Sequence, residues 1–454
     1  MRVSKWVLAG AALLGTISLP LRAGGPAAAA PASAVTPKYA VGTVTDTFVD
    51  ANRTTPAWGG DPQQSSRTLV TTILYPASGP AGGNAVTGAA PDTSAGPFPL
   101  IVFAHGLGGT QQGYINVLSA WASEGFVVAA PLFPLSNGNV PGGPDAGDVV
   151  NQPKDMSYVI DSVLHVSLLP GGTLSGLVDS KEIGAAGHSN GGVTTLGLVA
   201  NTCCDDPRVK TAIVMAGTTE GFPSGHYDFS KTPPLLLVHG TNDQLIPYRS
   251  APLIYNEARG PKGLLTLEGG SHDAAGGLDP RSASAVIRTT TDFFEAYLTG
   301  NRGARSRLAT DGTSPTSKIV LHLTPGPLGA AVVVPPVPVV HLRASVSPHQ
   351  NLTSGQAVTV RWSGYTAGKV INILECSHVD ISTGSSAGCG FANAGLLHPD
   401  PTGRGRFTMH IVTGKVGNGV CGSTHPCYIA VNNASSLSTS NTKVLKITFA
   451  PVTG

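Results

Sequence analysis

The sequence has few charged residues and almost no excess of either sign. Asp, Glu, Lys and Arg make up 12% of the 454 residues, and the formal net charge is +2. No basic patch therefore indicates a nucleic-acid partner, and no run of like charge indicates an acidic one. Since 41% of the residues are hydrophobic, the chain can fill the cores of two or three domains of ~150 residues each.

The sequence also lacks a long apolar run beyond its N-terminal region, and a membrane-spanning helix would need about 20 such residues. The spacings of its 13 histidines and 6 cysteines fit no zinc site. We therefore expect no metal, no cofactor and no stable insertion into a membrane. The oligomeric state does not follow from the sequence.

The N-terminus has the layout of a secretory signal peptide. Arg2 and Lys5 precede an apolar run from Trp6 to about Leu21, and Ala32-Ser33-Ala34 offers a cleavage site. A membrane anchor is the alternative, but the run is short and contains two glycines and a proline. We expect residues 1–34 to be a signal peptide and the mature protein to be secreted, where disulfides can form.

The remaining chain divides by composition into two domains. Residues 35–323 alternate short apolar runs with helix-compatible segments, which is typical of an α/β domain with a mostly parallel sheet covered on both faces. A proline-rich stretch at residues 324–340 predicts an extended linker. Residues 341–454 show short alternating strands separated by Gly, Ser and Asn turns, which predicts an all-β sandwich.

The most informative motif is Gly187-His188-Ser189-Asn190-Gly191-Gly192. It lies between the strand-like run Ile183–Ala186 and the helix-compatible run Val193–Ala200. A serine flanked by glycines at such a junction is typical of a nucleophile elbow, because the sharp turn strains the serine backbone and excludes bulky neighbours. An ordinary glycine-rich turn is the alternative, since the chain has 58 glycines.

Two further side chains follow strand-like runs in the order that a serine nucleophile needs. Asp243 comes shortly after Leu235–Val238, and His272 comes shortly after Leu264–Leu267. A histidine takes the serine proton and a carboxylate orients that histidine. Because loops at the carboxyl ends of parallel strands meet at one edge of the sheet, we expect these groups to converge.

These segments resemble the α/β-hydrolases, in particular the secreted esterases related to platelet-activating factor acetylhydrolases, dienelactone hydrolases and bacterial polyester hydrolases. The matching stretches include "LIVFAHGLGG", "DSKEIGAAGHSNGG", "LLLVHGTNDQLIP" and "GGSH", in family order over residues 40–300. The resemblance implies hydrolysis of carboxylic esters through an acyl-enzyme. It implies Ser189 as nucleophile, Asp243 as acid and His272 as base, with the amides of Leu107 and Asn190 as the oxyanion hole.

Several alternatives stay open at this point. A carrier protein that uses the β-sandwich is one, although the ordered triad argues against it; an amidase or peptidase on the same fold is another. The natural ester, whether small molecule, lipid or polymer, is not determined. Because the segment Gly217–Pro234 is too short for a lid domain, we expect an open cleft with accessible Leu107, Phe222 and Ile246. His105, His188 and His239 are expected to shape loops or to pack.

The C-terminal segment resembles the neocarzinostatin-type β-sandwich, an immunoglobulin-like fold with two short-range disulfides. The matching stretches include "ASVSPHQNLTSGQAVTV" and "VCGSTHPCYIAVNN". The resemblance implies the pairs Cys376–Cys389 and Cys421–Cys427. We favour a stalk or polymer-binding module and assign it no ligand. Cys203 and Cys204 either pair with each other or stay as buried thiols.

Overall fold

The computed structural model of the chain describes residues 37–223, 225–324, 331–335, 342–365, 371–379, 381, 386, 388–397, 403–433, 437 and 442–451, without the side chains of 391–393, 396 and 397. The predicted signal peptide and most of the predicted linker therefore lie outside the described residues. Within these ranges, no helix has the length and apolar character needed to cross a membrane.

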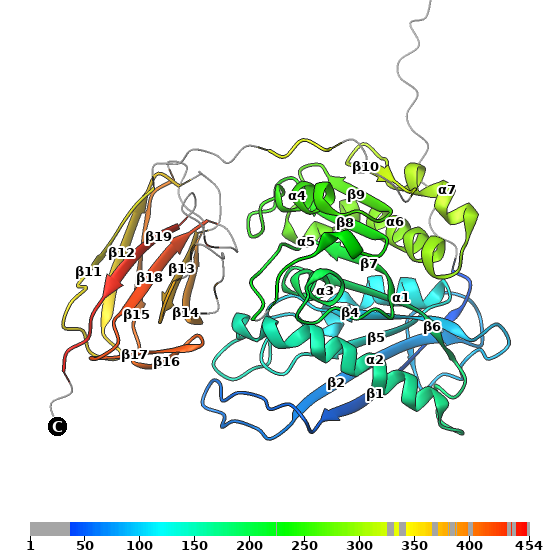
Figure 1. Cartoon of the computed structure of the whole chain (residues 1–454), viewed down its shortest axis with the longest axis horizontal. Helices are drawn as coiled ribbons and strands as arrows, with labels where there is room; N and C mark the ends of the chain where they lie inside the picture. The colour runs from blue at the N-terminus through cyan, green and yellow to red at the C-terminus, as the bar shows by residue number, and fades with distance from the viewer. Residues whose placement is uncertain are drawn as a thin grey trace, which may run out of the picture. The chain divides into compact units, whose positions relative to one another are not determined.

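A mixed sheet forms the centre of the first domain (Figure 1), and its described strands follow the order β10-β9-β8-β7-β6-β4-β5-β2-β1-β3. The central strands β5, β4, β6, β7, β8 and β9 pair in parallel. At the two sides, β2 pairs antiparallel to β5 and β1, and β10 pairs antiparallel to β9, whereas β3 pairs in parallel with β1. The bounds are β1 Ala40–Asp50, β2 Arg67–Ala77, β3 Val86–Thr87, β4 Phe98–Ala104, β5 Val127–Leu132, β6 Val178–His188, β7 Val209–Met215, β8 Leu235–Gly240, β9 Lys262–Leu267 and β10 Ser317–His322.

Helices cover both faces of this sheet (Figure 1), as predicted. One apolar cluster joins the sheet to α2 Gln152–Leu168, α3 Asn190–Ala200 and α4 Ser250–Glu257. The other joins it to α1 Ile115–Ser123, α5 His272–Ala275, α6 Pro280–Leu298 and α7 Arg302–Asp311. Short 3-10 turns complete the domain: η1 Gln111–Tyr114, η2 Ala146–Asn151 and η3 Phe229–Lys231.

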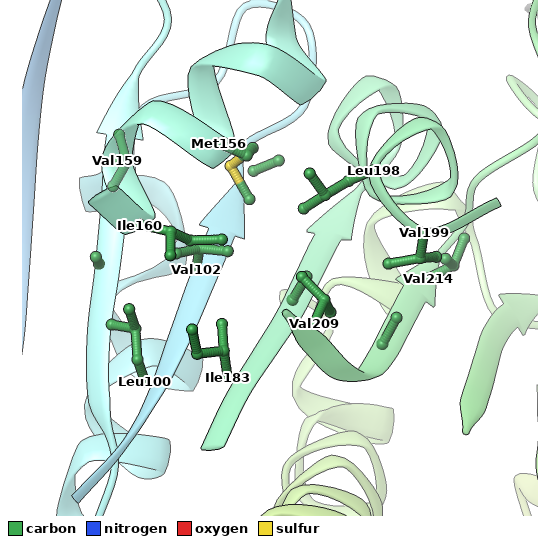
Figure 2. Close-up of a cluster of buried hydrophobic side chains, with 14 of the residues drawn as sticks. Leu100, Val102, Met156, Val159, Ile160, Ile183, Leu198, Val199, Val209 and Val214 are labelled. Carbon is green, nitrogen blue, oxygen red and sulfur yellow. The ribbon is translucent and has the colours of Figure 1, made fainter. Parts of the chain in front are cut away.

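The core explains why the central strands read as continuous apolar runs. Every residue of β4 is buried, since both faces of the strand are covered. Figure 2 shows Leu100 and Val102 of β4 beside Ile183 of β6, with Met156 and Ile160 of α2 packed over them. Each such side chain contributes about 1.5–3 kcal/mol by leaving water. This packing holds β4, β6, β7, β8 and β9 side by side, so their carboxyl ends share one edge.

The second domain is a β-sandwich, as predicted. Its sheets are β11-β12-β15 and β14-β13-β18-β19, and β16 pairs with β17 in a short ribbon. The sheets enclose a shared core that includes Val360, Trp362, Ile373 and Ile429. The bounds are β11 Arg343–Ser347, β12 Ala357–Ser363, β13 Ile371–Cys376, β14 Cys389–Leu397, β15 Gly405–His410, β16 Gly414–Val416, β17 Gly419–Cys421, β18 Cys427–Asn432 and β19 Thr442–Ile447.

All six cysteines are paired. Cys376 bonds to Cys389 and Cys421 bonds to Cys427, which are the pairs that the resemblance implied. The structure also joins the neighbours Cys203 and Cys204, just after α3. The adjacent-residue disulfide is thus the alternative that the structure adopts.

Candidate active site

Ser189 lies in the sharp turn between β6 and α3. Its φ of 59° and ψ of −121° are unusual for a residue with a Cβ, and such strain costs about 1–3 kcal/mol. A Cβ on Gly187 would lie 2.1 Å from the carbonyl oxygen of Gly191, and a Cβ on Gly191 would lie 2.0 Å from that of Ala104. The flanking glycines are therefore required by close backbone contacts, which is the reason predicted from the motif.

Asp243 and His272 meet at the carboxyl ends of two adjacent parallel strands. Asp243 follows β8, and His272 opens α5 just after β9. His272 Nδ1 donates a hydrogen bond to Asp243 Oδ2 at 2.7 Å. Because Nδ1 carries the proton in this bond, the lone pair of the neutral ring is on Nε2, where a base for a serine hydroxyl needs it.

The Asp243 carboxylate accepts four hydrogen bonds. Its Oδ2 also faces His239 Nε2 at 3.1 Å, and its Oδ1 accepts from the amides of Leu245 and Ile246 at 2.8 and 2.9 Å. Burial alone would raise the pKa of Asp243, but the hydrogen bonds from His239 and His272 outweigh burial and hold it well below its usual range. The carboxylate is therefore ionised, and its orientation is fixed.

Two backbone amides that line the same cleft as Ser189 have no hydrogen-bond partner among the described residues. In the loop after β4, the amide of Gly106 donates to Tyr114 Oη, that of Gly108 to Ser136 O and that of Gly109 to Gly106 O. Neither Leu107 N nor Asn190 N has a hydrogen-bond partner among the described residues. Asn190 is the first residue of α3, where amides point out along the helix axis. Among the four amides of residues 106–109, that of Leu107 is thus the one without a partner among the described residues.

The other histidines of the region hold loops together. His105 is buried; its Nδ1 donates to Gly106 O at 2.8 Å and its Nε2 accepts from the Phe133 amide at 3.1 Å. Burial lowers the pKa of His105 to about 4. His239 Nε2 also lies 3.0 Å from Ile246 O. These histidines shape the loops, as expected from the sequence, although the contact of His239 with Asp243 was not foreseen.

Ser189, His272 and Leu107 line a common cleft, and its other first-domain residues are mostly apolar: Tyr114, Val149, Val150, Val193, Leu245 and Ile246. Glu220 and Asp273 also line it, and no Lys or Arg does so among the described first-domain residues. The expectation of an accessible Phe222 is wrong: this ring is buried with Val149 and Val193 and packs against Gly197 of α3. Ile246 is also buried, at 3% exposure, although it lines the cleft. Over the described ranges, no cluster of His, Cys, Asp or Glu is placed to hold a metal ion.

Each of the two domains is similar in sequence to a known protein family. The sequence model of the chlorophyllase family matches residues 72–217, and that of the neocarzinostatin family matches residues 344–449. The first domain thus has the α/β-hydrolase fold and is similar to an esterase-type hydrolase family, and the second domain is neocarzinostatin-like. Together with the three disulfides, the second match indicates that this hydrolase is extracellular.

Among solved structures, the hydrolase is similar to a ferulic acid esterase from Streptomyces cinnamoneus. The two are 24% identical, the match covers 60% of this chain and 93% of that one, and the TM-score is 0.42. The search of curated proteins found no match for the hydrolase.

Proposed function

We propose that the hydrolase cleaves carboxylic esters through a covalent acyl-enzyme on Ser189. The observation that carries the proposal is the hydrogen bond from His272 Nδ1 to the buried Asp243 carboxylate, at the cleft that Ser189 also lines. This bond leaves the basic lone pair of His272 on Nε2. The strained turn supports the proposal, because it presents Ser189 at the end of a rigid strand.

The reaction proceeds in two halves. His272 Nε2 takes the hydroxyl proton while Ser189 Oγ attacks the ester carbonyl, and the amides of Leu107 and Asn190 stabilise the oxyanion. His272 then gives the proton to the departing alcohol, and the acyl-enzyme forms. In the second half, water loses a proton to His272 and attacks the acyl group; the acid is released and Ser189 recovers its proton.

The cleft favours neutral esters with an apolar group. Its first-domain lining is mainly aliphatic, so a hydrocarbon chain or ring leaves water when it binds. Asp273 adds negative charge there, which disfavours substrates that carry a free carboxylate. Burial raises the pKa of Glu220 to about 8, so its carboxyl group is largely neutral at pH 7. We further propose that residues 1–34 direct secretion; N-terminal sequencing of the protein from the growth medium tests this, and a start at Met1 would contradict it.

The decisive experiment compares the wild type with Ser189→Ala. We expect the wild type to hydrolyse p-nitrophenyl acetate and butyrate and the variant to lose activity by about 10⁶-fold, as when a serine nucleophile acts with a base as one unit. Ser162→Ala, on α2 away from the cleft, is the matched control and should keep full activity. Circular dichroism shows whether each variant folds. Turnover of peptide anilides in place of esters would instead support the amidase alternative.

A further inference from the structure

We propose that Tyr114 and His188 are positioning residues, which tie the oxyanion loop to the His272 loop through one chain of hydrogen bonds. The inference rests on the proposed ester hydrolysis at Ser189. Gly106 N–H lies 3.2 Å from Tyr114 Oη, and Tyr114 Oη lies 2.8 Å from His188 Nδ1. His188 Nε2 lies 3.0 Å from the carbonyl oxygen of His272. The chain therefore spans three separate segments of the proposed machinery.

The two ends of this chain fix the direction of every hydrogen bond in it. Gly106 N–H can only donate, so Tyr114 Oη accepts there and uses its own proton elsewhere. The His272 carbonyl can only accept, so the His188 proton is on Nε2. The Nδ1 of a neutral His188 then accepts the Tyr114 proton. One tautomer of His188 satisfies all four groups, and the other tautomer would break both of its bonds.

The surroundings of His188 keep its ring neutral. The side chain is buried, its ring centroid is 4.8 Å from that of His272, and a Cβ on Gly276 would lie 3.1 Å from His188 Cδ2. Burial, reinforced by the nearby His272 ring, lowers the pKa of His188 to about 3. Burial likewise raises the pKa of Tyr114 to about 12. Neither group changes its protonation state in the neutral range, so the chain keeps one arrangement.

Each contact of the chain lies on a residue that carries a proposed reacting group or directly precedes one. Gly106 precedes Leu107, whose amide is the proposed oxyanion donor, and His188 precedes Ser189. The third contact is the backbone of His272 itself. A shift of about 1 Å between such groups lowers turnover by about 100-fold. The chain thus acts on catalysis through the placement of its neighbours, without a bond to the substrate.

The first test is Tyr114→Phe, which removes one oxygen atom and leaves Gly106 N–H and His188 Nδ1 without partners. We expect kcat for p-nitrophenyl butyrate to fall by about 10- to 100-fold with KM changed less than threefold. Phosphorylation of Ser189 by p-nitrophenyl diethyl phosphate, which releases p-nitrophenolate, should slow in parallel. Tyr75→Phe is the matched control: Tyr75 is also a buried tyrosine, lies on β2 and donates to Ala89 O. A Tyr114→Phe enzyme with kcat within twofold of the control overturns the proposal, whatever its thermal stability.

The second test replaces His188. His188→Gln can return an N–H to the His272 carbonyl, whereas His188→Leu cannot. We therefore expect the kcat of His188→Gln to be at least tenfold higher than that of His188→Leu. Equal losses in the two variants contradict a role in positioning. Nitrogen-15 NMR of histidine-labelled wild type provides a readout that needs no variant to fold. We expect His188 to be the neutral Nε2–H tautomer from pH 5 to 9, and a charged or Nδ1–H ring would refute the chain.

These outcomes are distinct from failure of the proposed function. If wild type lacks esterase activity, or Ser189→Ala retains it, the proposed function fails while the NMR result still stands for the chain itself. If wild type is active and Ser189→Ala is not, the Tyr114 and His188 variants alone decide whether these residues position the machinery.

Discussion

The substitution Asp243→Asn tests the geometry of the site most stringently, because it changes one atom and no shape. The wild-type carboxylate accepts two backbone amides on Oδ1 and two histidine N–H groups on Oδ2. An asparagine must place its NH2 group against one of these pairs of donors. Backbone amides cannot move their protons, but a histidine can change tautomer. The NH2 group will therefore face the histidines.

In that arrangement His272 Nδ1 has to accept the hydrogen bond, and its proton moves to Nε2. A ring protonated on Nε2 cannot take the proton of Ser189. The loss from this tautomer error is about 10⁴-fold in kcat in an enzyme of the same chemistry, or about 5.4 kcal/mol of transition-state stabilisation at 1.36 kcal/mol per tenfold. Substrate binding does not use Asp243, so KM should change little.

Stopped assays with p-nitrophenyl butyrate from pH 5 to 9 measure this effect. Since the pKa of the wild-type carboxylate lies well below its usual range, the wild-type group is ionised throughout this interval and the deficit should be present at every pH. Asp161→Asn, on the exposed face of α2, is the control and should leave kcat unchanged. An Asp243→Asn enzyme that retains a tenth of the wild-type kcat would refute the assigned role of Asp243.

Three other predictions concern stability. Gly187→Ala should cost at least about 3 kcal/mol, because overpacking alone costs about 1–3 kcal/mol and the new Cβ would meet the Gly191 carbonyl at 2.1 Å; Gly113→Ala, with open space around it, should change urea unfolding by less than about 0.5 kcal/mol. Reduction of Cys376–Cys389, which closes 13 residues, should destabilise the β-sandwich by about 3 kcal/mol in thermal melts with and without reductant. His188→Gln should remove one titrating group. The unfolded histidine has a pKa of about 6.5, whereas burial lowers the pKa of the folded one to about 3. Between these pH values, the contribution of His188 lowers the free energy of unfolding of the wild type by about 1.4 kcal/mol for each pH unit of acidification, and the variant should lack this dependence. Urea midpoints at pH 4 to 7 that differ from wild type by a constant amount would contradict this last expectation.

The parallel core could be predicted from the sequence because double-sided burial leaves a clear signal. Leu235–Val238 is apolar at every position and Leu264–Leu267 at every position but Thr266, and the two runs form the first four residues of β8 and the last four of β9. The sheet borders gave no such signal. In β1, exposed Thr45 and Thr47 and half-buried Asp46 interrupt the apolar pattern, and α7 buries only Ala304 and Leu308. An element that packs through two side chains has too weak a periodicity to be read from one sequence.

The proposed triad could be predicted for a related reason. Strand order fixes where loops converge, so motifs after β6, β8 and β9 had to meet, and the Asp243–His272 hydrogen bond is consistent with that. Contacts that depend on side-chain packing were not predictable. Tyr114 reaches His188 across 74 residues of sequence, and no motif marks it. Phe222 was misjudged because its segment lies beside the cleft but turns the ring towards α3.

The complete burial of α3 has a consequence for how the enzyme loses activity. Every residue of this helix after Asn190 is buried, so the helix that follows Ser189 has no solvated side from which it could unfold separately. Amide hydrogens of α3 should then exchange with solvent only when the whole domain unfolds. The loss of activity and the loss of folded structure on heating will follow a single curve. The residual rate of ester hydrolysis will therefore be proportional to the fraction of folded molecules in a sample.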